Sequence, residues 1–332
     1  MPYYFNLPLI DRLTTDQQRA VDDTDPIAMS GGPGTGKTVV NLHRHIRNYD
    51  TGQKRSLLVT YTKTLEHYLK KCAELRNDEA AENISRTLSC RINNSYDEII
   101  VDEAQDVKID KYRQFSNSVS EISYSADIAQ SLYLTETDVK KLVENLEELF
   151  PYNESYRLRR NFRNTKEILV FTQAVFPDIQ IDHSDIESAI SGNLPFVAVV
   201  GWDEDDMVEK IVEIAQEFGS ETANIGILLP TQNQVDKFYG LLRNELSCTY
   251  FHSKHEVVRG LENIHITTFK SAKGLEFDTV IIPNFDSYDW FIKNTEVKMN
   301  EYYVGLTRAK QNLFLVCKND LNGIDTSTYE TE

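Results

Sequence analysis

Residues 31–38 read Gly-Gly-Pro-Gly-Thr-Gly-Lys-Thr, and this string lies between an apolar run and a helical stretch. Glycines let backbone N–H groups curl around a phosphate without Cβ clashes, and the N-terminus of a following helix adds positive potential. The lysine can reach the β- and γ-phosphates of ATP, and the last threonine hydroxyl can bind Mg²⁺. In this setting a phosphate-binding loop is favoured over a plain glycine-rich turn. We expect ATP contacts from Gly31, Gly34, Gly36, Lys37 and Thr38.

A second chemical signal is the string Ile-Ile-Val-Asp-Glu-Ala-Gln-Asp at residues 99–106. A buried strand would deliver Asp102 at its tip, where the carboxylate can hold Mg²⁺ together with Thr38. Glu103 is placed to orient or deprotonate a water that attacks the γ-phosphate. An acidic pair at a strand end is often merely solvated, but downstream of a phosphate loop it predicts an ATP hydrolase that uses Mg²⁺.

These residues need a scaffold of alternating strands and helices. Short β-branched and apolar runs between helices are typical of parallel sheets buried on both faces. Such runs occur at 27–30, 56–60, 98–101, 197–200, 225–229, 264–268, 279–282 and 312–316. Helical spacing of apolar residues occurs at 37–49, 138–150, 203–218 and 232–246. The pattern predicts an α/β fold with two parallel sheets in two domains, 1–166 and 167–332, and a frayed tail over the last dozen residues.

The length of the chain and the distribution of its charges agree with two domains whose surfaces differ in net charge. The chain has 332 residues and a net charge of −17. Residues 1–166 carry 23 Lys+Arg and 25 Asp+Glu, whereas residues 167–332 carry 12 and 27. This balance excludes a histone-like polybasic binder, which needs cations to displace phosphate counterions, but it allows a local basic groove.

The four scattered cysteines argue against a disulfide scaffold or zinc knuckle. The absence of a signal-peptide core or a long apolar run leads us to expect a cytoplasmic protein with no membrane partner.

Several strings, in this order, resemble the motifs of superfamily-one helicases of the UvrD/Rep/PcrA kind. They lie at 13–21, 57–65, 101–106, 125–133, 156–164, 267–277 and 302–309. The resemblance spans both halves of the chain and implies two tandem RecA-like P-loop domains with the ATP site in the cleft between them. It also implies that the string at 57–65 touches single-stranded nucleic acid and that Gln105 couples the nucleotide to the rest of the core.

The resemblance implies further nucleotide contacts. Gln17 would read the adenine edge, and its amide can donate and accept as adenine requires. Phe162 would stack on adenine, Gly274 would lie near phosphate and Glu276 near the ribose. Val39 occupies a place where many relatives have an arginine that covers the other adenine face.

Three residues would respond to the γ-phosphate. By the resemblance, Gln130 would sense it, and Arg163 and Arg308 would act as arginine fingers that neutralise developing charge. Their approach on domain closure would convert nucleotide state into motion. An isolated arginine would more often form a surface ion pair, and that reading stays open as the alternative.

Departures from the family pattern shape the predicted function. Only 36 residues, from 62 to 97, separate the third motif string from the strand before Asp102. About twenty lie between the 232–246 helix and residue 264, so both accessory domains of relatives are reduced to turns. The segment after Tyr133 lacks the aromatic and arginine residues that stack bases in the family, a platform worth about 1–3 kcal/mol per base.

We therefore predict a minimal translocase or helicase that acts on single-stranded DNA or RNA, with weak or partner-assisted binding. The alternative is a nucleotide-gated regulatory subunit that switches a protein partner, such as a nuclease in a bacterial antiviral defence system of the Gabija type. This link is by analogy alone. A third reading, a P-loop protein that binds nucleotide without hydrolysing it, is disfavoured by the intact acidic and arginine positions.

Overall fold

Two parallel sheets form the framework of the computed structural model, which describes residues 2–90, 92, 95–127, 130–132, 136–179 and 181–331. The chain divides into a first unit, Phe5–Asn161, and a second unit, Phe162–Glu332 together with Met1–Tyr4. Each unit contains one sheet, and the named strands of both sheets pair in parallel. The predicted α/β class with two parallel sheets, the arrangement of tandem RecA-like domains, is confirmed.

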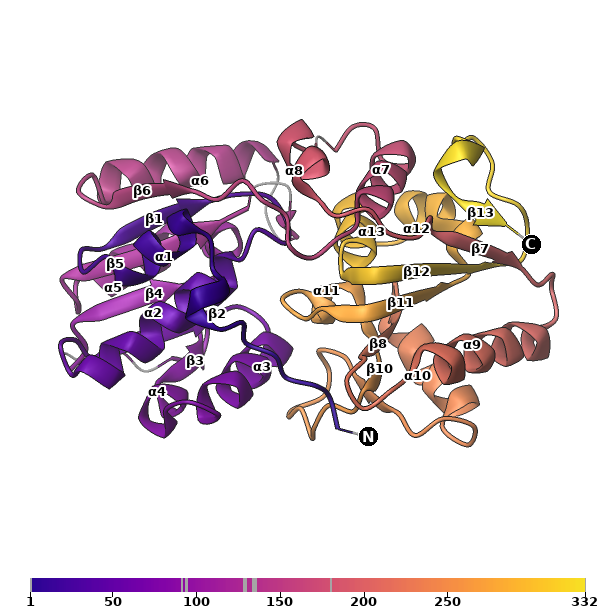
Figure 1. Cartoon of the computed structure of the whole chain (residues 1–332), viewed down its shortest axis with the longest axis horizontal. Coiled ribbons are helices and arrows are strands. Elements are labelled where there is room, and N and C mark those ends of the chain that lie inside the picture. The colour runs from indigo at the N-terminus through magenta and orange to yellow at the C-terminus, as the bar shows by residue number, and fades with distance from the viewer. Residues whose placement is uncertain are drawn as a thin grey trace. The chain divides into compact units, whose positions relative to one another are not determined.

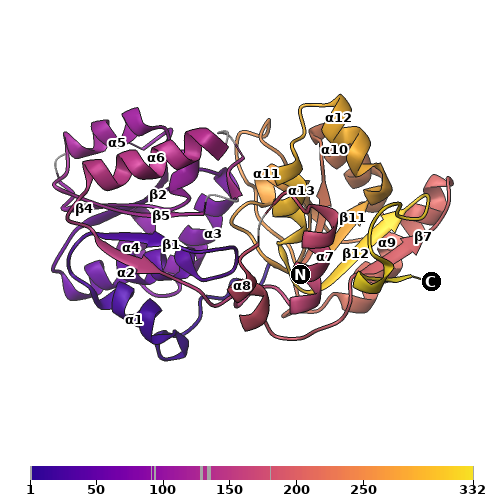
Figure 2. The same cartoon turned by 90° about the horizontal axis from the view of Figure 1, so that it is seen from above.

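The sheet of the first unit has six strands in the order β3-β2-β4-β5-β1-β6. Their bounds are β1 Ile27–Ser30, β2 Ser56–Thr60, β3 Ile84–Arg86, β4 Glu98–Val101, β5 Glu121–Ala126 and β6 Glu154–Arg157. Its helices are α1 Thr15–Asp22, α2 Lys37–Thr51, α3 Lys63–Glu74, α4 Asp78–Glu82, α5 Ile109–Ser116 and α6 Glu136–Leu149. Figure 2 shows α5 and α6 on one face of this sheet and α1 and α2 on the other. Central strands are therefore covered on both faces, as their continuous apolar runs predict.

The sheet of the second unit has seven strands in the order β13-β7-β12-β11-β8-β10-β9. Their bounds are β7 Phe196–Val199, β8 Ile225–Leu229, β9 Thr249–Phe251, β10 Ile264–Thr268, β11 Phe277–Pro283, β12 Ala309–Cys317 and β13 Glu330–Thr331. Its helices are α7 Lys166–Val175, α8 His183–Ser188, α9 Glu204–Phe218, α10 Gln232–Leu242, α11 Phe269–Ala272, α12 Tyr288–Asn294 and α13 Met299–Leu306. In Figure 1, α9 and α10 cover one face of this sheet, and α7, α12 and α13 cover the other.

Local signals explain where several helices begin. Thr62, Thr165 and Thr231 each precede a helix and accept a hydrogen bond from the backbone N–H three residues on, which satisfies a donor that the first helical turn leaves unpaired. Asp203 caps α9 in the same role, through Asp205 N–H. The acidic residues that follow it suit the positive end of the helix dipole, so they stabilise the start of α9.

All eight predicted strands are present with shifts of a few residues at their ends, and the four predicted helices are present as α2, α6, α9 and α10. The prediction of a frayed C-terminal tail is wrong. The tail adds strand β13 to the sheet edge, where Glu330 pairs with Phe196 and Thr331 with Val197, and the Tyr329 ring packs edge-on against Phe171. Two polar strand residues carry no apolar periodicity, so the sequence gives no signal for this pairing.

Candidate nucleotide-binding site

Three neighbouring strands of the first sheet, β4, β5 and β1, position the predicted phosphate and metal residues. The loop at 31–36 follows β1, Asp102 follows β4 and Asp127 follows β5. Parallel strands end at the same edge of a sheet, and ligands of open α/β sheets bind at that edge. The strand order therefore brings these three segments together.

Glycines shape the loop because there is no space for larger residues and the backbone is left-handed. Gly34 and Gly36 have φ of 70° and 88°, values that side chains strongly disfavour. A Cβ on Gly36 would lie 2.4 Å from Nε2 of Gln17, and a Cβ on Gly31 would lie 2.5 Å from the carbonyl oxygen of Leu158. Both contacts are far inside van der Waals distance, so the loop conformation requires glycine at these positions.

Lys37 opens helix α2, and its ammonium group lies against the loop. Its Nζ donates to the carbonyl oxygens of Gly31 and Gly32, each at 2.8 Å, and lies 3.5 Å from Oδ2 of Asp127. Because the ammonium and the loop amides lie in one place, the loop concentrates positive potential there. This is the arrangement expected of a cradle for a polyphosphate.

Gln17 braces the same loop. Its Oε1 accepts from Thr14 N–H at 2.9 Å in a capping box at the start of α1, and its Nε2 donates to the carbonyl oxygen of Thr35 at 2.9 Å. The side chain is buried. Both ends of the amide are thus used to join α1 to the loop, and the role of Gln17 in reading adenine stays a prediction.

Asp102 is a buried acceptor surrounded by donors. Its Oδ2 accepts from the Thr38 hydroxyl at 2.9 Å, and its Oδ1 accepts from Asn41 Nδ2 at 2.8 Å and from the Ser125 hydroxyl at 3.0 Å. Burial, followed by repulsion from the Glu103 carboxylate, raises the pKa of Asp102 to about 6. A divalent cation beside the carboxylate would favour its ionised form, and carboxylate and hydroxyl oxygens are ligands that Mg²⁺ prefers. The donor set therefore fits the predicted metal site.

Glu103 lies next to Asp102 in a left-handed conformation, with φ of 58°. Non-glycine residues in this region cost about 1–3 kcal/mol and often occur at functional sites. Gln105 donates from Nε2 to the Glu103 carboxylate and accepts at Oε1 from Asp127 N–H at 3.0 Å. Asp127 in turn accepts from Gln130 Nε2 at 2.7 Å. A chain of hydrogen bonds thus runs from Glu103 to the carboxylate beside Lys37.

Sequence reasoning missed four residues that complete this site. Asn41 and Ser125 donate to Asp102, Asp127 pairs with Lys37, and Asn161 Nδ2 donates to the carbonyl oxygen of Pro33 in the loop at 2.9 Å. A usable sequence signal existed for one of them. Asn41 lies one helical turn after the loop lysine and so shares its face.

In the second unit, Arg163 and Glu276 form an ion pair, with Nε and Oε2 3.0 Å apart. Lys310 Nζ lies 3.8 Å from the other carboxylate oxygen. Burial alone would raise the pKa of Glu276, but the charges of Arg163 and Lys310 and the hydrogen bond from Arg163 outweigh it and lower the pKa. The structure therefore brings two predicted site residues together as an ionised pair.

Arg308 is fully buried in the second unit. Its Nε donates to the carbonyl oxygen of Val304 at 3.0 Å. Nearby, Asn164 Nδ2 donates to the carbonyl oxygens of Thr307 at 3.1 Å and of Ala309 at 2.7 Å. The segment that carries Arg163 is thus fixed to the segment that carries Arg308. Because Arg308 is buried, an ion pair on the surface does not explain it.

The other predicted contacts are dispersed. Gly274 has φ of 86°, Phe162 is 46% exposed, and Val39 packs partly buried against the core formed with α1 and β1. Residues 133–135, at the start of the segment that lacks base-stacking residues, lie outside the described residues. The site residues fall into two groups. The first unit carries the phosphate loop together with Gln17, Asp102, Glu103 and Gln130. The second unit carries Arg163, Arg308 and Glu276.

Residues 243–320 match the model of the UvrD-like helicase C-terminal domain. This segment is similar to the C-terminal domain of UvrD-like helicases. The resemblance to superfamily-one UvrD-like helicases is thereby confirmed. The UvrD-like domain runs from the end of α10 to the residues after β12 and includes Glu276 and Arg308. A comparison with curated proteins finds no match.

Solved structures similar to this chain include helicases. The C-terminal domain of a possible DNA helicase from Lactobacillus plantarum WCFS1 has 20% identity and a TM-score of 0.39, over 51% of this chain and 98% of that one. Arterivirus nonstructural protein 10, a helicase, has 13% identity and a TM-score of 0.46, over 92% of this chain and 62% of that one. The PRRSV helicase has 14% identity and a TM-score of 0.47, over 88% and 52%. The chain thus spans roughly half to two thirds of the viral helicases.

Among the described residues, no helix combines the length and the apolar character that crossing a bilayer needs.

Proposed function

We propose that this protein is a Mg²⁺-dependent ATP hydrolase that works as a minimal translocase on single-stranded nucleic acid. The observation that carries the proposal is the contact of 2.9 Å between the Thr38 hydroxyl and Oδ2 of Asp102, at the residue that follows the loop lysine Lys37. A phosphate cradle and an oxygen-rich metal position in one place are the parts that phosphoryl transfer requires. The UvrD-like C-terminal domain supports a helicase-like use of that chemistry.

Each residue of the first unit has a definite role in the proposal. Lys37 and the loop amides would hold the β- and γ-phosphates, and Thr38 and Asp102 would hold Mg²⁺, which neutralises phosphate charge when bound. Glu103 would orient the attacking water and accept its proton. Gln105 keeps the Glu103 carboxylate in place, and the hydrogen-bond chain through Asp127 links that carboxylate to the phosphate cradle.

The second unit contributes the proposed response to hydrolysis. We propose that Arg163 and Arg308 stabilise charge on the γ-phosphate and that Phe162, Gly274 and Glu276 complete the nucleotide contacts. The ion pair between Arg163 and Glu276 holds the guanidinium group in one orientation, and the buried hydrogen bond of Arg308 does the same for the second arginine. Preorganised donors of this kind cost little reorganisation at the moment of reaction.

The nucleic-acid part of the proposal concerns single-stranded DNA in the first place and RNA as the alternative substrate. Most cations of the chain lie in its first half, with 23 Lys+Arg against 12 in the second half. A strand-tracking groove depends on such cations, so we propose that the first unit provides most of the phosphate contacts. The acidic second half is the observation that favours the competing function, a nucleotide-gated subunit that switches a protein partner.

Phosphate release with and without single-stranded DNA tests these proposals. Glu103→Gln should lower kcat at least about 100-fold, the usual contribution of a general base, and Lys37→Ala should abolish hydrolysis. Glu82→Gln is the matched control, because Glu82 is exposed on α4, and it should leave the rate unchanged. If DNA and RNA both fail to stimulate an intact ATPase, the translocase is excluded and the partner-switching function is favoured. Hydrolysis that survives Glu103→Gln would overturn the assigned base.

A further inference from the structure

One face of helix α10 is joined to the edge strand β9 and to the turn after it. Gln232 Nε2 donates to the Ser253 hydroxyl at 2.7 Å. Seven residues further along the helix, the ring of Tyr239 stacks on that of Tyr250 with centroids 3.8 Å apart. Residues spaced by four and three lie on one face of a helix, so position 236, between these two contacts, faces the same turn.

Asp236, His252 and His255 meet at that position. Oδ1 of Asp236 lies 3.0 Å from Nε2 of His252, and the two histidine rings have centroids 4.0 Å apart. The turn brings the rings together because His255 N–H donates to the carbonyl oxygen of His252 at 2.9 Å. One donor atom from each of the three side chains lies within 4.8 Å of the other two.

His252 carries a second, independent observation. The residue is only 3% exposed, and its Nδ1 has no hydrogen-bond partner among the described residues. The carboxylate of Asp236 can only accept, so the proton of their hydrogen bond lies on Nε2, and a cation that displaces this proton would bind Nε2 and the carboxylate oxygen together. An unpaired polar atom in such a buried place is costly. The contact with Asp236 thus holds the buried ring at Nε2, the nitrogen that would bind the cation.

We propose that Asp236, His252 and His255 bind one divalent transition-metal ion, with Zn²⁺ as the principal candidate. Two imidazoles and one carboxylate form a donor set that Zn²⁺ accepts readily and that Mg²⁺ and Ca²⁺ do not favour. Ligand atoms around a tetrahedral zinc ion lie about 3.3 Å apart. Small side-chain rotations would therefore close the present cluster around the ion.

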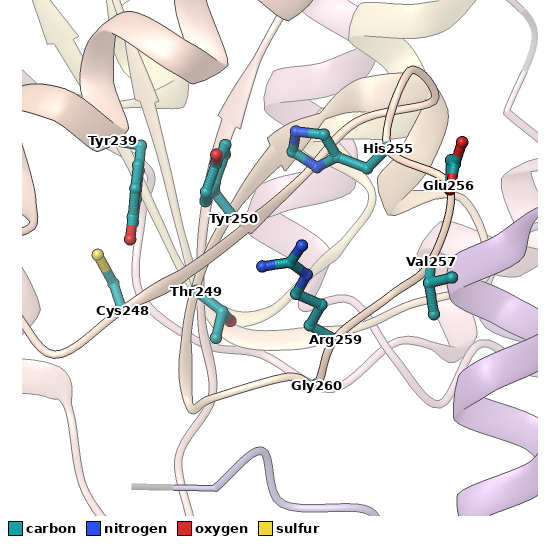
Figure 3. A pocket seen from close by; sticks show the side chains of 9 residues that line it. All are labelled: Tyr239, Cys248, Thr249, Tyr250, His255, Glu256, Val257, Arg259 and Gly260. Atoms are coloured by element: carbon teal, nitrogen blue, oxygen red, sulfur yellow. The ribbon is translucent and has the colours of Figure 1, made fainter.

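The site has an approach from solvent. His255 lines a pocket of about 550 Å³, together with Tyr250, Cys248 and Arg259. Figure 3 shows the His255 ring beside Tyr250 and above Arg259 in this pocket. Three protein ligands leave a fourth position of a tetrahedral ion for water or another small ligand, and the pocket gives that ligand room. The metal would also tie the turn after β9 to α10.

Zn²⁺ titration of the chelator-treated full chain, followed by calorimetry, tests the proposal. We expect one equivalent of Zn²⁺ to bind without nucleotide, and a Co²⁺-loaded sample to show the absorption of a tetrahedral site. His255→Ala and Asp236→Asn should each weaken Zn²⁺ binding at least about tenfold. His255 and Asp236 are not fully buried, so these variants should fold, and His252→Gln provides a third readout if circular dichroism shows it folded.

His183→Ala is the matched control, because His183 also lies beside a carboxylate, 3.3 Å from Glu187, but both side chains are exposed on α8. It should bind Zn²⁺ like the wild type. Asp102→Asn should do so too, since the proposed Mg²⁺ position in the first unit is a different site, and its loss of ATPase would leave the zinc result intact. Equal Zn²⁺ affinity in the wild type and in His255→Ala, or no stoichiometric binding by the wild type, would overturn the proposal.

Discussion

Replacing Arg44 with methionine should destabilise the first unit by about 3–5 kcal/mol, the usual effect of removing one partner of a buried ion pair. Arg44 on α2 and Glu98 on β4 are both 0% exposed. Nε and Nη2 of Arg44 each lie 2.9 Å from Oε1 of Glu98. The pair ties the helix that begins at Lys37 to the strand that ends just before Asp102, so it holds the phosphate and metal positions in register.

The magnitude follows from what each variant leaves behind. In Arg44→Met the Glu98 carboxylate keeps hydrogen bonds from Asn48 Nδ2, at 2.8 Å, and from the Ser123 hydroxyl, but it loses its countercharge. A buried carboxylate in this state either remains charged at high cost or takes up a proton. The double variant Arg44→Met/Glu98→Gln removes the orphaned charge. It should therefore be less destabilised than the sum of its single variants, by about 1–3 kcal/mol.

The two tryptophans make the assay specific. Trp202 and Trp290 both belong to the second unit, so tryptophan fluorescence during urea unfolding reports that unit, whereas far-ultraviolet circular dichroism reports both. We expect the circular dichroism transition to move to lower urea. Arg113→Met removes an exposed pair with Asp110 in the same unit and should cost no more than about 1 kcal/mol. An Arg44→Met variant as stable as this control would refute the reasoning.

Three further predictions concern other buried groups. Asp127→Asn should lower kcat for phosphate release at least about tenfold, because it removes a charged partner of Lys37, and such bonds are worth about 1.5–3 kcal/mol. Burial lowers the pKa of His45 to about 4, so the neutral ring stabilises the fold above the unfolded pKa of 6.5. That contribution should fall by about 2 kcal/mol between about pH 7 and pH 5, and urea unfolding of His45→Asn should show a flatter pH profile. Asn164→Ala leaves two buried carbonyl oxygens unpaired, which should destabilise the second unit by about 1–3 kcal/mol in the tryptophan signal.

Most of the framework could be predicted from sequence because its central strands are continuous apolar runs, as at Leu57–Val59 and Ile225–Leu229. Strand β5, at the centre of the first sheet, was missed because Ser123 and Ser125 interrupt its apolar pattern. Both serines are buried and point to other polar groups: Ser123 donates to Glu98 and Ser125 to Asp102. The two serines therefore have two effects. They interrupt the apolar pattern by which a buried strand is recognised in a sequence, and they donate hydrogen bonds to the buried carboxylates.

The phosphate loop could be predicted because glycine spacing before a lysine has few other uses. The proposed zinc site could not be predicted from the sequence. Its two histidines are three residues apart in a polar segment, and its carboxylate lies on the preceding helix. His252 and His255 alone suggest only a polar turn. They become candidate metal ligands only because Asp236 packs against that turn, and no local sequence pattern predicts this packing.

The chain of hydrogen bonds from Glu103 to Lys37 shows why the site depends on more than its motif residues. Glu103 has a left-handed backbone that costs energy, and the Gln105 amide holds its carboxylate while also accepting from the backbone of Asp127. The Asp127 carboxylate then lies 3.5 Å from the loop ammonium. A shift of the loop around its ligand can therefore reach the proposed base by two routes: through Asp127 and Gln105, and through Thr38 and Asp102, which directly precedes Glu103. Of these two routes, only the one through the Gln105 amide acts directly on the Glu103 carboxylate, because Gln105 Nε2 donates to it; the route through Asp102 acts on the Glu103 backbone.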